Sequence, residues 1–268
     1  MSDAVAAQYA TGPSRVNIER ALLAAGKNFD RLSAGDLGLL QDFHTMCPIA
    51  TAQLVDLLDI ESGTRVLDAG SGIGGTARYI ADRFGCTVTA VDLTEDYCET
   101  NRWLNALVGL DERISVHEGD VTRLPFAEGG FDAVISQHVQ MNVADKPQLY
   151  CEAHRVLAPG GRLAIWDIVA GDGGLDYPLP WADQPERSHL VTAEQLRVDV
   201  EAAGFVIEHW NDLTETAAAL MQAILAQPQG PLGLQAFVPD FPRKAANLTA
   251  ALADGRLRAI QAVATRPA

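Results

Sequence analysis

The stretch VLDAGSGIGG, residues 66–75, decides the fold because a short apolar run passes directly into a glycine-rich turn. Gly70, Gly72 and Gly75 have the spacing GxGxxG. Glycine is needed in such a turn because the backbone takes positive φ values and passes close to a ligand. The N–H groups at the start of the following helix then point at that ligand. The stretch therefore predicts a strand, a ligand-binding turn and a helix in succession.

Apolar runs and amphipathic segments alternate along the rest of the chain's middle. Strands are expected at 65–68, 86–91, 114–117, 131–136, 162–169 and 205–210. Helical patterns fall between them at 73–84, 103–108 and 149–157, and Thr192 with Gln195 has the spacing of a capping box for a helix that ends at Gly204. Parallel strands joined by helical crossovers need cover on both faces. The predicted fold class is α/β, a doubly wound and mostly parallel sheet.

The two flanks carry helical patterns without strand patterns. We expect residues 1–60 to form an N-terminal helical cap and residues 212–256 a helical insertion, both packed on a core at 61–211. Within them, helices are expected at 18–25, at 49–58 and on either side of Pro228 to Pro239. Residues 257–268 are expected to hold a last strand and a tail, although their alanine content leaves a helix open.

Composition narrows the classes of partner. The chain has 268 residues, with 20 Lys and Arg against 35 Asp and Glu and a net charge of −15. This charge repels phosphate backbones and anionic membranes, so neither nucleic acid nor a membrane is expected as a partner. No apolar run approaches the length of about 20 residues that spans a bilayer, and Met1 to Ala10 holds no basic residue, so we expect a cytoplasmic protein.

The cysteines do not suggest a metal site. They stand at positions 47, 86, 98 and 151, without the spacing of metal ligands and without a nearby histidine spaced for zinc. We expect reduced, scattered thiols and no metal.

An acid after the second predicted strand adds to the glycine turn. Asp92 follows Gly70 by about 20 residues, the spacing at which a carboxylate can accept both hydroxyls of an adenosine ribose. The alternative is a tight turn between strand and helix with an exposed aspartate. The combination of turn and acid favours a ligand that contains a nucleoside.

Two nucleoside ligands fit this pattern, a dinucleotide and S-adenosylmethionine. Asp68 precedes the first glycine by two residues, where it would repel a pyrophosphate but attract a sulfonium or an ammonium. Asp120 follows the third predicted strand, where a carboxylate can accept from an adenine amino group. These acids favour S-adenosylmethionine.

The region from Arg65 to Ile168 resembles the class I S-adenosylmethionine-dependent methyltransferases, in the type 11 group. Its motifs in order are VLDAGSGIGGTARYIA, TAVDLT, GDVTRLPF, FDAVISQHVQM and RVLAPGGRLAIWDI. Within that group it is similar to small-molecule N- and O-methyltransferases, such as those of glycine, sarcosine and dimethylglycine and those of sugars and polyketides. The resemblance implies a Rossmann-like, seven-stranded sheet with an antiparallel last strand, and S-adenosylmethionine as cofactor.

The chain departs from the family between the last two strands. In the family these usually form a hairpin, whereas about 45 residues separate Trp210 from Leu257 here, which favours inserted helices over a bare loop.

The resemblance also implies a set of cofactor-binding residues: Asp68, Gly70, Ser71, Gly72, Asp92, Leu93, Asp120, Val121, Ser136 and Gln137. Asp68 and the glycines would lie against the methionine half and the ribose. Asp92 and Leu93 would hold the ribose and adenine, and Asp120 with Val121 would contact the adenine edge.

His138 is the candidate catalytic residue. It follows the fourth predicted strand, and ligands of open α/β sheets bind at the carboxyl ends of the strands. If the acceptor is a hydroxyl or an ammonium, its proton needs a base, and an imidazole has a suitable pKa. The alternative is a structural histidine behind the sheet. Candidate substrate contacts, each of which could instead be a core, capping or loop residue, are His44, Gln140, Asn142, Trp166, Tyr177 and Trp181.

The predicted function is transfer of a methyl group from S-adenosylmethionine to a nitrogen or oxygen of a small molecule, either a glycine- or sarcosine-like amine or a natural-product scaffold. One alternative is a protein of the same fold that binds the cofactor without methyl transfer, as a cyclase would. An NAD(P)-dependent oxidoreductase is a further alternative, which Asp68 and Asp120 disfavour. A small-molecule substrate is the expected partner, with a homodimer as an option.

Overall fold

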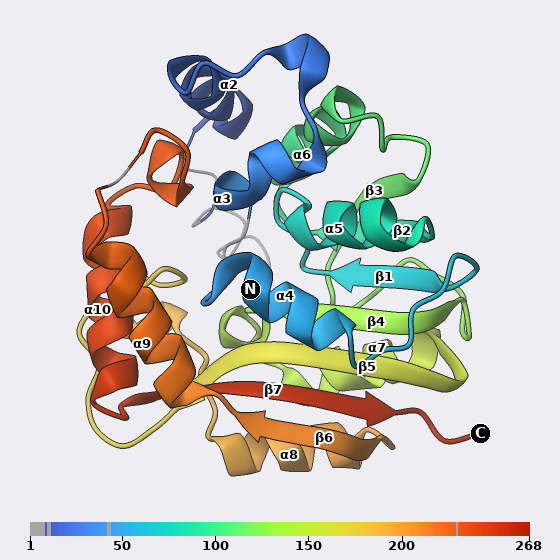
Figure 1. Cartoon of the computed structure of the whole chain (residues 1–268). Coiled ribbons are helices and arrows are strands. Elements are labelled where there is room, and N and C mark those ends of the chain that lie inside the picture. The colour runs from blue at the N-terminus through green and yellow to red at the C-terminus, as the bar shows by residue number, and fades with distance from the viewer. Residues whose placement is uncertain (1–8, 10–11, 42–43, 229) are drawn as a thin grey trace.

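The computed structural model describes residue 9 and residues 12–41, 44–228 and 230–268. Its centre is a seven-stranded sheet in the order β3-β2-β1-β4-β5-β7-β6, seen nearly edge-on in Figure 1. The strands are β1 Arg65–Ala69, β2 Thr87–Asp92, β3 Ile114–Glu118, β4 Phe131–Gln137, β5 Leu157–Ala170, β6 Val206–Asp212 and β7 Leu257–Thr265. Neighbours from β3 to β5 pair in parallel, and β7 runs antiparallel to both β5 and β6. The predicted fold class is confirmed.

Successive strand residues face opposite sides of the sheet, and both sides are covered. Val66 packs into one buried cluster with α4 and α5, while Leu67 packs into a second cluster with α7 and α8. Both β1 side chains are almost fully buried, which explains why the strand reads as a continuous apolar run.

The helices lie in three groups. Helices α4 (Cys47–Val55), α5 (Gly75–Phe84), α9 (Thr214–Leu225) and α10 (Phe241–Ala253) contribute to the first cluster. On the other face lie α7 (Lys146–Val156) and α8 (Ala193–Ala202), while α2 (Ser14–Ala24) packs on α6 (Glu95–Leu107). A short α3 (Gly38–Gln41) and the 3-10 turns Phe29–Arg31, Ala34–Leu37, Gln140–Asn142, Pro185–Arg187 and Leu234–Ala236 complete the chain. None of the helices in the described ranges has the length and hydrophobicity of a membrane span.

The capping residue predicted for α8 is confirmed. The Thr192 hydroxyl accepts from the backbone N–H of Gln195 at 3.2 Å. The Gln195 side chain donates instead to Asp199, so the side chain predicted to complete a reciprocal box extends along the helix.

The last strand and the insertion before it also follow the sequence prediction. β7 is a strand rather than a helix, and its small buried residues, such as Ala259 and Ala262, fit between β5 and β6. Helices α9 and α10 fill the segment that precedes it, beside the carboxyl ends of the parallel strands (Figure 1). Leu248 of α10 lines the same cavity as Gly70, so the insertion contributes to the wall of the site.

Candidate active site

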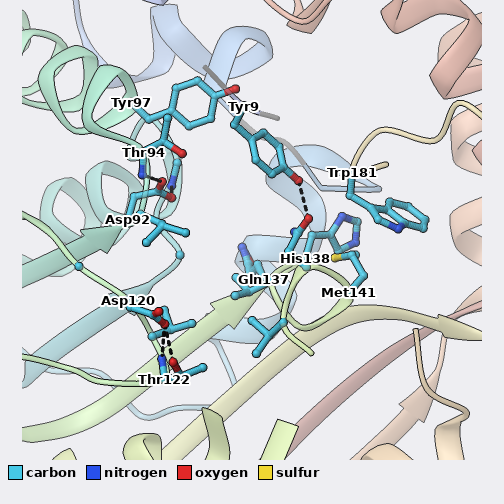
Figure 2. Close-up of a pocket in the computed structure, with 18 of the residues that line it drawn as sticks. Tyr9, Asp92, Thr94, Tyr97, Asp120, Thr122, Gln137, His138, Met141 and Trp181 are labelled. Carbon is cyan, nitrogen blue, oxygen red and sulfur yellow. Dashed lines mark hydrogen bonds between the residues drawn. The ribbon is translucent and has the colours of Figure 1, made fainter. Parts of the chain in front are cut away.

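A cavity of about 450 Å³ lies at the carboxyl ends of the parallel strands. Its wall consists of Tyr9, Gly70, Gly72, Asp92, Leu93, Thr94, Tyr97, Gly119, Asp120, Val121, Thr122, Gln137, His138, Val139, Met141, Asn142, Val143, Ala144, Asp145, Pro180, Trp181 and Leu248. Figure 2 shows that Asp92 and Asp120 lie on one side of this cavity, and His138, Met141 and Trp181 on the other. We refer to these as the acidic end and the histidine end.

The glycine turn forms part of the wall near the acidic end. Gly70 has φ +82°, and a Cβ atom there would lie 2.3 Å from Cγ2 of Val139. The N–H groups of Gly70 and Ser71 both donate to the carbonyl of Val91, at 2.8 and 2.9 Å, which fastens the turn to β2. A residue with a side chain at Gly70 would be strained and would clash.

The third positive φ value of the turn falls at Gly74 rather than at Gly75. Gly74 has φ +88°, and a Cβ atom there would lie 2.1 Å from Oδ1 of Asn101. Gly75 is the first residue of α5. The GxGxxG spacing found the turn, but the third conformational requirement for glycine lies one residue earlier.

Asp92 joins the glycine turn to the acidic end. Its Oδ2 accepts from the N–H of Gly72 at 2.7 Å, and its Oδ1 accepts from the N–H of Thr94 at 2.9 Å. Burial raises the pKa of Asp92, and these N–H donors partly oppose the shift. The carboxylate is therefore held in one orientation in the cavity wall.

Asp120 is held by a second turn of the same type. Its Oδ1 accepts from the N–H of Thr122 at 2.8 Å and from the Thr122 hydroxyl at 2.6 Å, as Figure 2 shows. Both acids thus precede a threonine by two residues, an arrangement that orders the loop after each strand.

Asp68 precedes the first glycine of the turn by two residues. It is not among the described residues that line the cavity. Its side chain is 2% exposed, and burial raises its pKa to about 7, partly opposed by a hydrogen bond from the N–H of Ala77. Within the described structure, Oδ2 of Asp68 is a buried acceptor with no hydrogen-bond partner. Such an oxygen would be stabilised by a cation or a bridging water.

His138 reaches the cavity from a strained backbone position directly after β4. It has φ +54°, and its N–H donates to the carbonyl of Trp166 at 2.8 Å. Its ring stacks on Trp166 with the centroids 6.2 Å apart, and Nε2 lies 3.3 Å from Oγ1 of Thr45. Positive φ in a residue other than glycine is uncommon and concentrates at functional sites.

A hydrogen-bonded group behind the wall supports the histidine end. Gln137 donates to the hydroxyls of Thr51 and Thr76 at 3.2 and 2.9 Å. His44 Nε2 lies 3.0 Å from Oγ1 of Thr51, and its ring meets His138 edge to face. Asp42 and Phe43, which precede His44, lie outside the described residues.

Several predicted contact residues do not line the cavity that the described residues form, namely Asp68, Ser71, Ser136, His44, Gln140, Trp166 and Tyr177. For two of them burial corrects the prediction of direct substrate contact. Trp166 is completely buried and donates to the carbonyl of Thr45 at 3.1 Å. Gln140 is also completely buried and donates to the carbonyl of Ile168. Both side chains support the wall from within the core.

The prediction missed other wall residues. Thr94 and Thr122 could have been found, because each ends an Asp-x-Thr sequence that begins with a predicted acid. Tyr9 could not, because it lies in the N-terminal segment, 133 residues from Asn142, whose Oδ1 accepts from its hydroxyl at 3.0 Å. Leu248 was missed because it comes from the inserted α10.

Comparison with known proteins identifies the core of the chain. Residues 67–165 match the family described as "Methyltransferase domain". These residues belong to that family. The methyltransferase domain contains β2, β3 and β4 and most of β1 and β5, and hence both Asp-x-Thr turns and His138.

Two known methyltransferases are similar in sequence to this chain. The methyltransferase GfsG of Streptomyces halstedii is 34% identical over 193 residues, which cover 70% of this chain and 66% of the relative. The glycine/sarcosine/dimethylglycine N-methyltransferase of Actinopolyspora halophila is 31% identical over 176 residues, covering 65% of this chain and 31% of the relative. The chain therefore spans only part of the length of these relatives.

Solved structures agree on the fold of the methyltransferase domain. Phosphoethanolamine N-methyltransferase 2 of Haemonchus contortus, in complex with phosphomonomethylethanolamine and S-adenosylhomocysteine, has a TM-score of 0.70 at 21% identity, covering 85% of this chain and 55% of that one. The cyclase SpnF has a TM-score of 0.65 at 21% identity, covering 96% of this chain and 98% of that one. At this identity the likeness shows the class I S-adenosylmethionine-dependent methyltransferase fold.

Proposed function

We propose that this protein transfers a methyl group from S-adenosylmethionine to a nitrogen or oxygen of a small molecule. The observation that carries the proposal is one cavity with two ends. The glycine turn and two oriented carboxylates form the acidic end, and His138 lies at the histidine end on the other side.

The acidic end fits the cofactor. Asp92 would accept from the ribose hydroxyls, and Asp120 would accept from the adenine amino group. The buried, unpartnered oxygen of Asp68 lies under the turn, where the positive charges of the methionine half would stabilise its ionised form. Gly70 leaves no room for a side chain, so the backbone can lie close to the ligand.

His138 is placed to act as the general base for the methyl acceptor. When bound, S-adenosylmethionine supplies a methyl group whose bond to sulfur breaks, with the electron pair staying on sulfur, as the bond to the acceptor nitrogen or oxygen forms. A ring nitrogen of neutral His138 accepts the proton that the acceptor loses. Thr45 and the stacked Trp166 orient the ring, and Met141 and Trp181 keep water from the histidine end.

Calorimetry with S-adenosylhomocysteine tests the cofactor site. The wild type is expected to bind, and Asp92→Ala to lose about 1.5–3 kcal/mol of binding free energy, because hydrogen bonds to a charged group are lost. Asp132→Ala is the matched control, since Asp132 pairs with Arg65 at the opposite end of the sheet. Equal affinities of the two variants would refute the ribose assignment, and failure of the wild type to bind would refute the proposal.

Single-turnover transfer of a labelled methyl group to amines, phenols and sugars then separates a methyltransferase from a cyclase-like protein that only binds the cofactor. A cytoplasmic location and a homodimer remain predictions from the sequence.

A further inference from the structure

Apart from Asp92 and Asp120, the described wall of the cavity contains one carboxylate, Asp145, and one histidine, His138. The same wall includes Tyr9, Met141, Asn142, Val143, Ala144, Pro180, Trp181 and Leu248. Among the described residues, no lysine or arginine lines any part of the cavity. The residues outside the described ranges include no lysine or arginine either, so they add no cationic side chain.

Two lysines that lie close in the sequence to wall residues already bind other groups of the protein. The ammonium of Lys146 donates to the carbonyls of Val143 and His189, and that of Lys244 pairs with Asp183 at 3.0 Å. Lys146 is 3% exposed and Lys244 is 8% exposed, so neither side chain is available to a ligand without breaking these bonds.

The charges that do line the cavity are negative. Asp92 and Asp120 belong to the acidic end, and Asp145 caps α7 by accepting from the N–H of Gln148 at 3.1 Å. A carboxylate or phosphate group placed at the histidine end would lose water without gaining a lysine or arginine partner from the described wall, and it would also meet the field of these acids. The wall therefore disfavours an anionic acceptor.

Asn142 indicates what the wall binds instead. Its Oδ1 accepts from the hydroxyl of Tyr9, so the amide N–H groups are the part of this side chain that can donate to a ligand. Donors of this kind recognise a carbonyl, ether or hydroxyl oxygen. The surrounding aromatic and aliphatic side chains of Trp181, Met141 and Leu248 suit an apolar body.

We infer that the methyl acceptor is an uncharged, largely apolar molecule, which presents a hydroxyl to His138 and a further oxygen to Asn142. This inference rests on the proposed function and narrows it. The new bond is then carbon to oxygen, and the hydroxyl proton passes to His138. Amino acids and phosphate esters, the substrate classes named for several relatives, are disfavoured because each carries an anionic group.

A matched pair of probes tests the charge argument without knowledge of the natural acceptor. The probes are 2-naphthol and 2-naphthoate, which share one ring system and differ in charge at neutral pH. With S-adenosylhomocysteine already bound, calorimetry should show 2-naphthol binding more tightly by about tenfold or more. Equal affinities, tighter binding of the naphthoate, or no binding of 2-naphthol would overturn the inference.

The variant Asn142→Lys reverses the discrimination. A lysine at this position should tighten 2-naphthoate binding by about tenfold and leave 2-naphthol no tighter than in the wild type, because it supplies the missing cation. Binding of S-adenosylhomocysteine to the same sample reports that the variant is folded. A folded variant with unchanged preference would overturn the inference.

Methyl transfer gives the second measurement. With phenols as acceptors the protein should form S-adenosylhomocysteine, whereas with glycine, sarcosine or phosphoethanolamine it should not. Turnover of these amines, each of which carries a carboxylate or a phosphate, would overturn the inference while leaving the proposed function intact. Loss of S-adenosylhomocysteine binding itself would instead overturn the proposed function.

Discussion

Two Asp-x-Thr turns determine where the carboxylates of the acidic end point. In each turn the aspartate accepts from the backbone of the threonine two residues later. Asp92 additionally accepts from Gly72, so one side chain couples the turn after β2 to the turn after β1. Orientation before binding lowers the entropy that a ligand must lose, which is why such residues contribute to affinity beyond their charge.

His138 should affect turnover and not cofactor binding. Asn tolerates positive φ, so His138→Asn keeps the backbone conformation while it removes the base. We expect kcat to fall about 10²- to 10⁴-fold, measured as S-adenosylhomocysteine release, with unchanged cofactor affinity by calorimetry. The exposed His209 serves as control, and His209→Asn should retain full activity. Full activity of His138→Asn would make His138 a structural residue.

Asp68 should make the stability of the free protein depend on pH. Burial raises its pKa in the folded state from 3.8 to about 7. Between these values the folded state binds more protons than the unfolded state, so the free energy of unfolding falls as pH rises. The contribution of Asp68 is complete below pH 3.8 and is lost as pH passes about 7.

Asp68→Asn isolates this contribution, because Asp167, whose pKa is also raised to about 7 by burial, titrates in the same range. Denaturant unfolding at several pH values should show a smaller decline between about pH 4 and 7 in Asp68→Asn than in the wild type. The pKa of Asp92 is also raised, but Asp92 is present in both proteins and so produces no difference between their curves. Parallel curves would show that Asp68 is not the titrating group.

At the scale of elements, the turn between β1 and α5 is constrained by its neighbours. β4 is followed by Val139, whose side chain lies where a Cβ atom of Gly70 would be, and α6 places Asn101 against Gly74. The glycine pattern is therefore a packing requirement between elements as well as a conformational one. Strands that meet at one edge of a sheet leave little space between their following loops.

Gly70→Ala should cost more than backbone strain alone. Gly109 is the matched control, since it has φ +69° but no atom within 4 Å of a Cβ atom placed there. We expect Gly109→Ala to cost about 1–2 kcal/mol of unfolding free energy, and Gly70→Ala about 1–3 kcal/mol more because of the clash with Val139. Denaturant unfolding measures both, and equal losses would contradict the packing argument.

At the scale of the whole molecule, the cavity joins segments from both ends of the chain. Tyr9 comes from the N-terminal segment, Leu248 from α10, and both line the wall with residues of the sheet. The hydrogen bond from Tyr9 to Asn142 joins Tyr9 to the loop after β4. The histidine end of the cavity therefore forms only when these distant parts of the chain pack together.

Tyr9→Phe should lower the free energy of unfolding. Loss of its hydrogen bond to Asn142 is expected to cost about 0.5–1.5 kcal/mol of unfolding free energy. The hydroxyl of Tyr79 instead bonds Arg83 at the surface of α5, so Tyr79→Phe should cost less than about 0.5 kcal/mol. Equal costs, measured by denaturant unfolding, would show that the hydrogen bond to Asn142 does not stabilise the fold.

The sheet was predictable because its signals are local. Apolar runs, the glycine turn and the Thr192 cap each act within a few residues, and the structure confirms the strands, the order of the helices and the inserted α9 and α10. The acids Asp68, Asp92 and Asp120, at or just beyond the carboxyl ends of β1, β2 and β3, were found for the same reason, since they stand at fixed spacings within local motifs.

The sequence by itself determined the methyltransferase fold and the acidic end, because periodicity and motif spacing are properties of contiguous residues. The sequence also predicted His138, Asn142 and Trp181, which line the cavity. Only the tertiary structure decided the rest of the histidine end. It placed Tyr9 and Leu248 in the wall and Trp166 and Gln140 in the core, through contacts between segments far apart in the chain. Whether a side chain faces a cavity or a core depends on what packs against it, and that packing has no local signal.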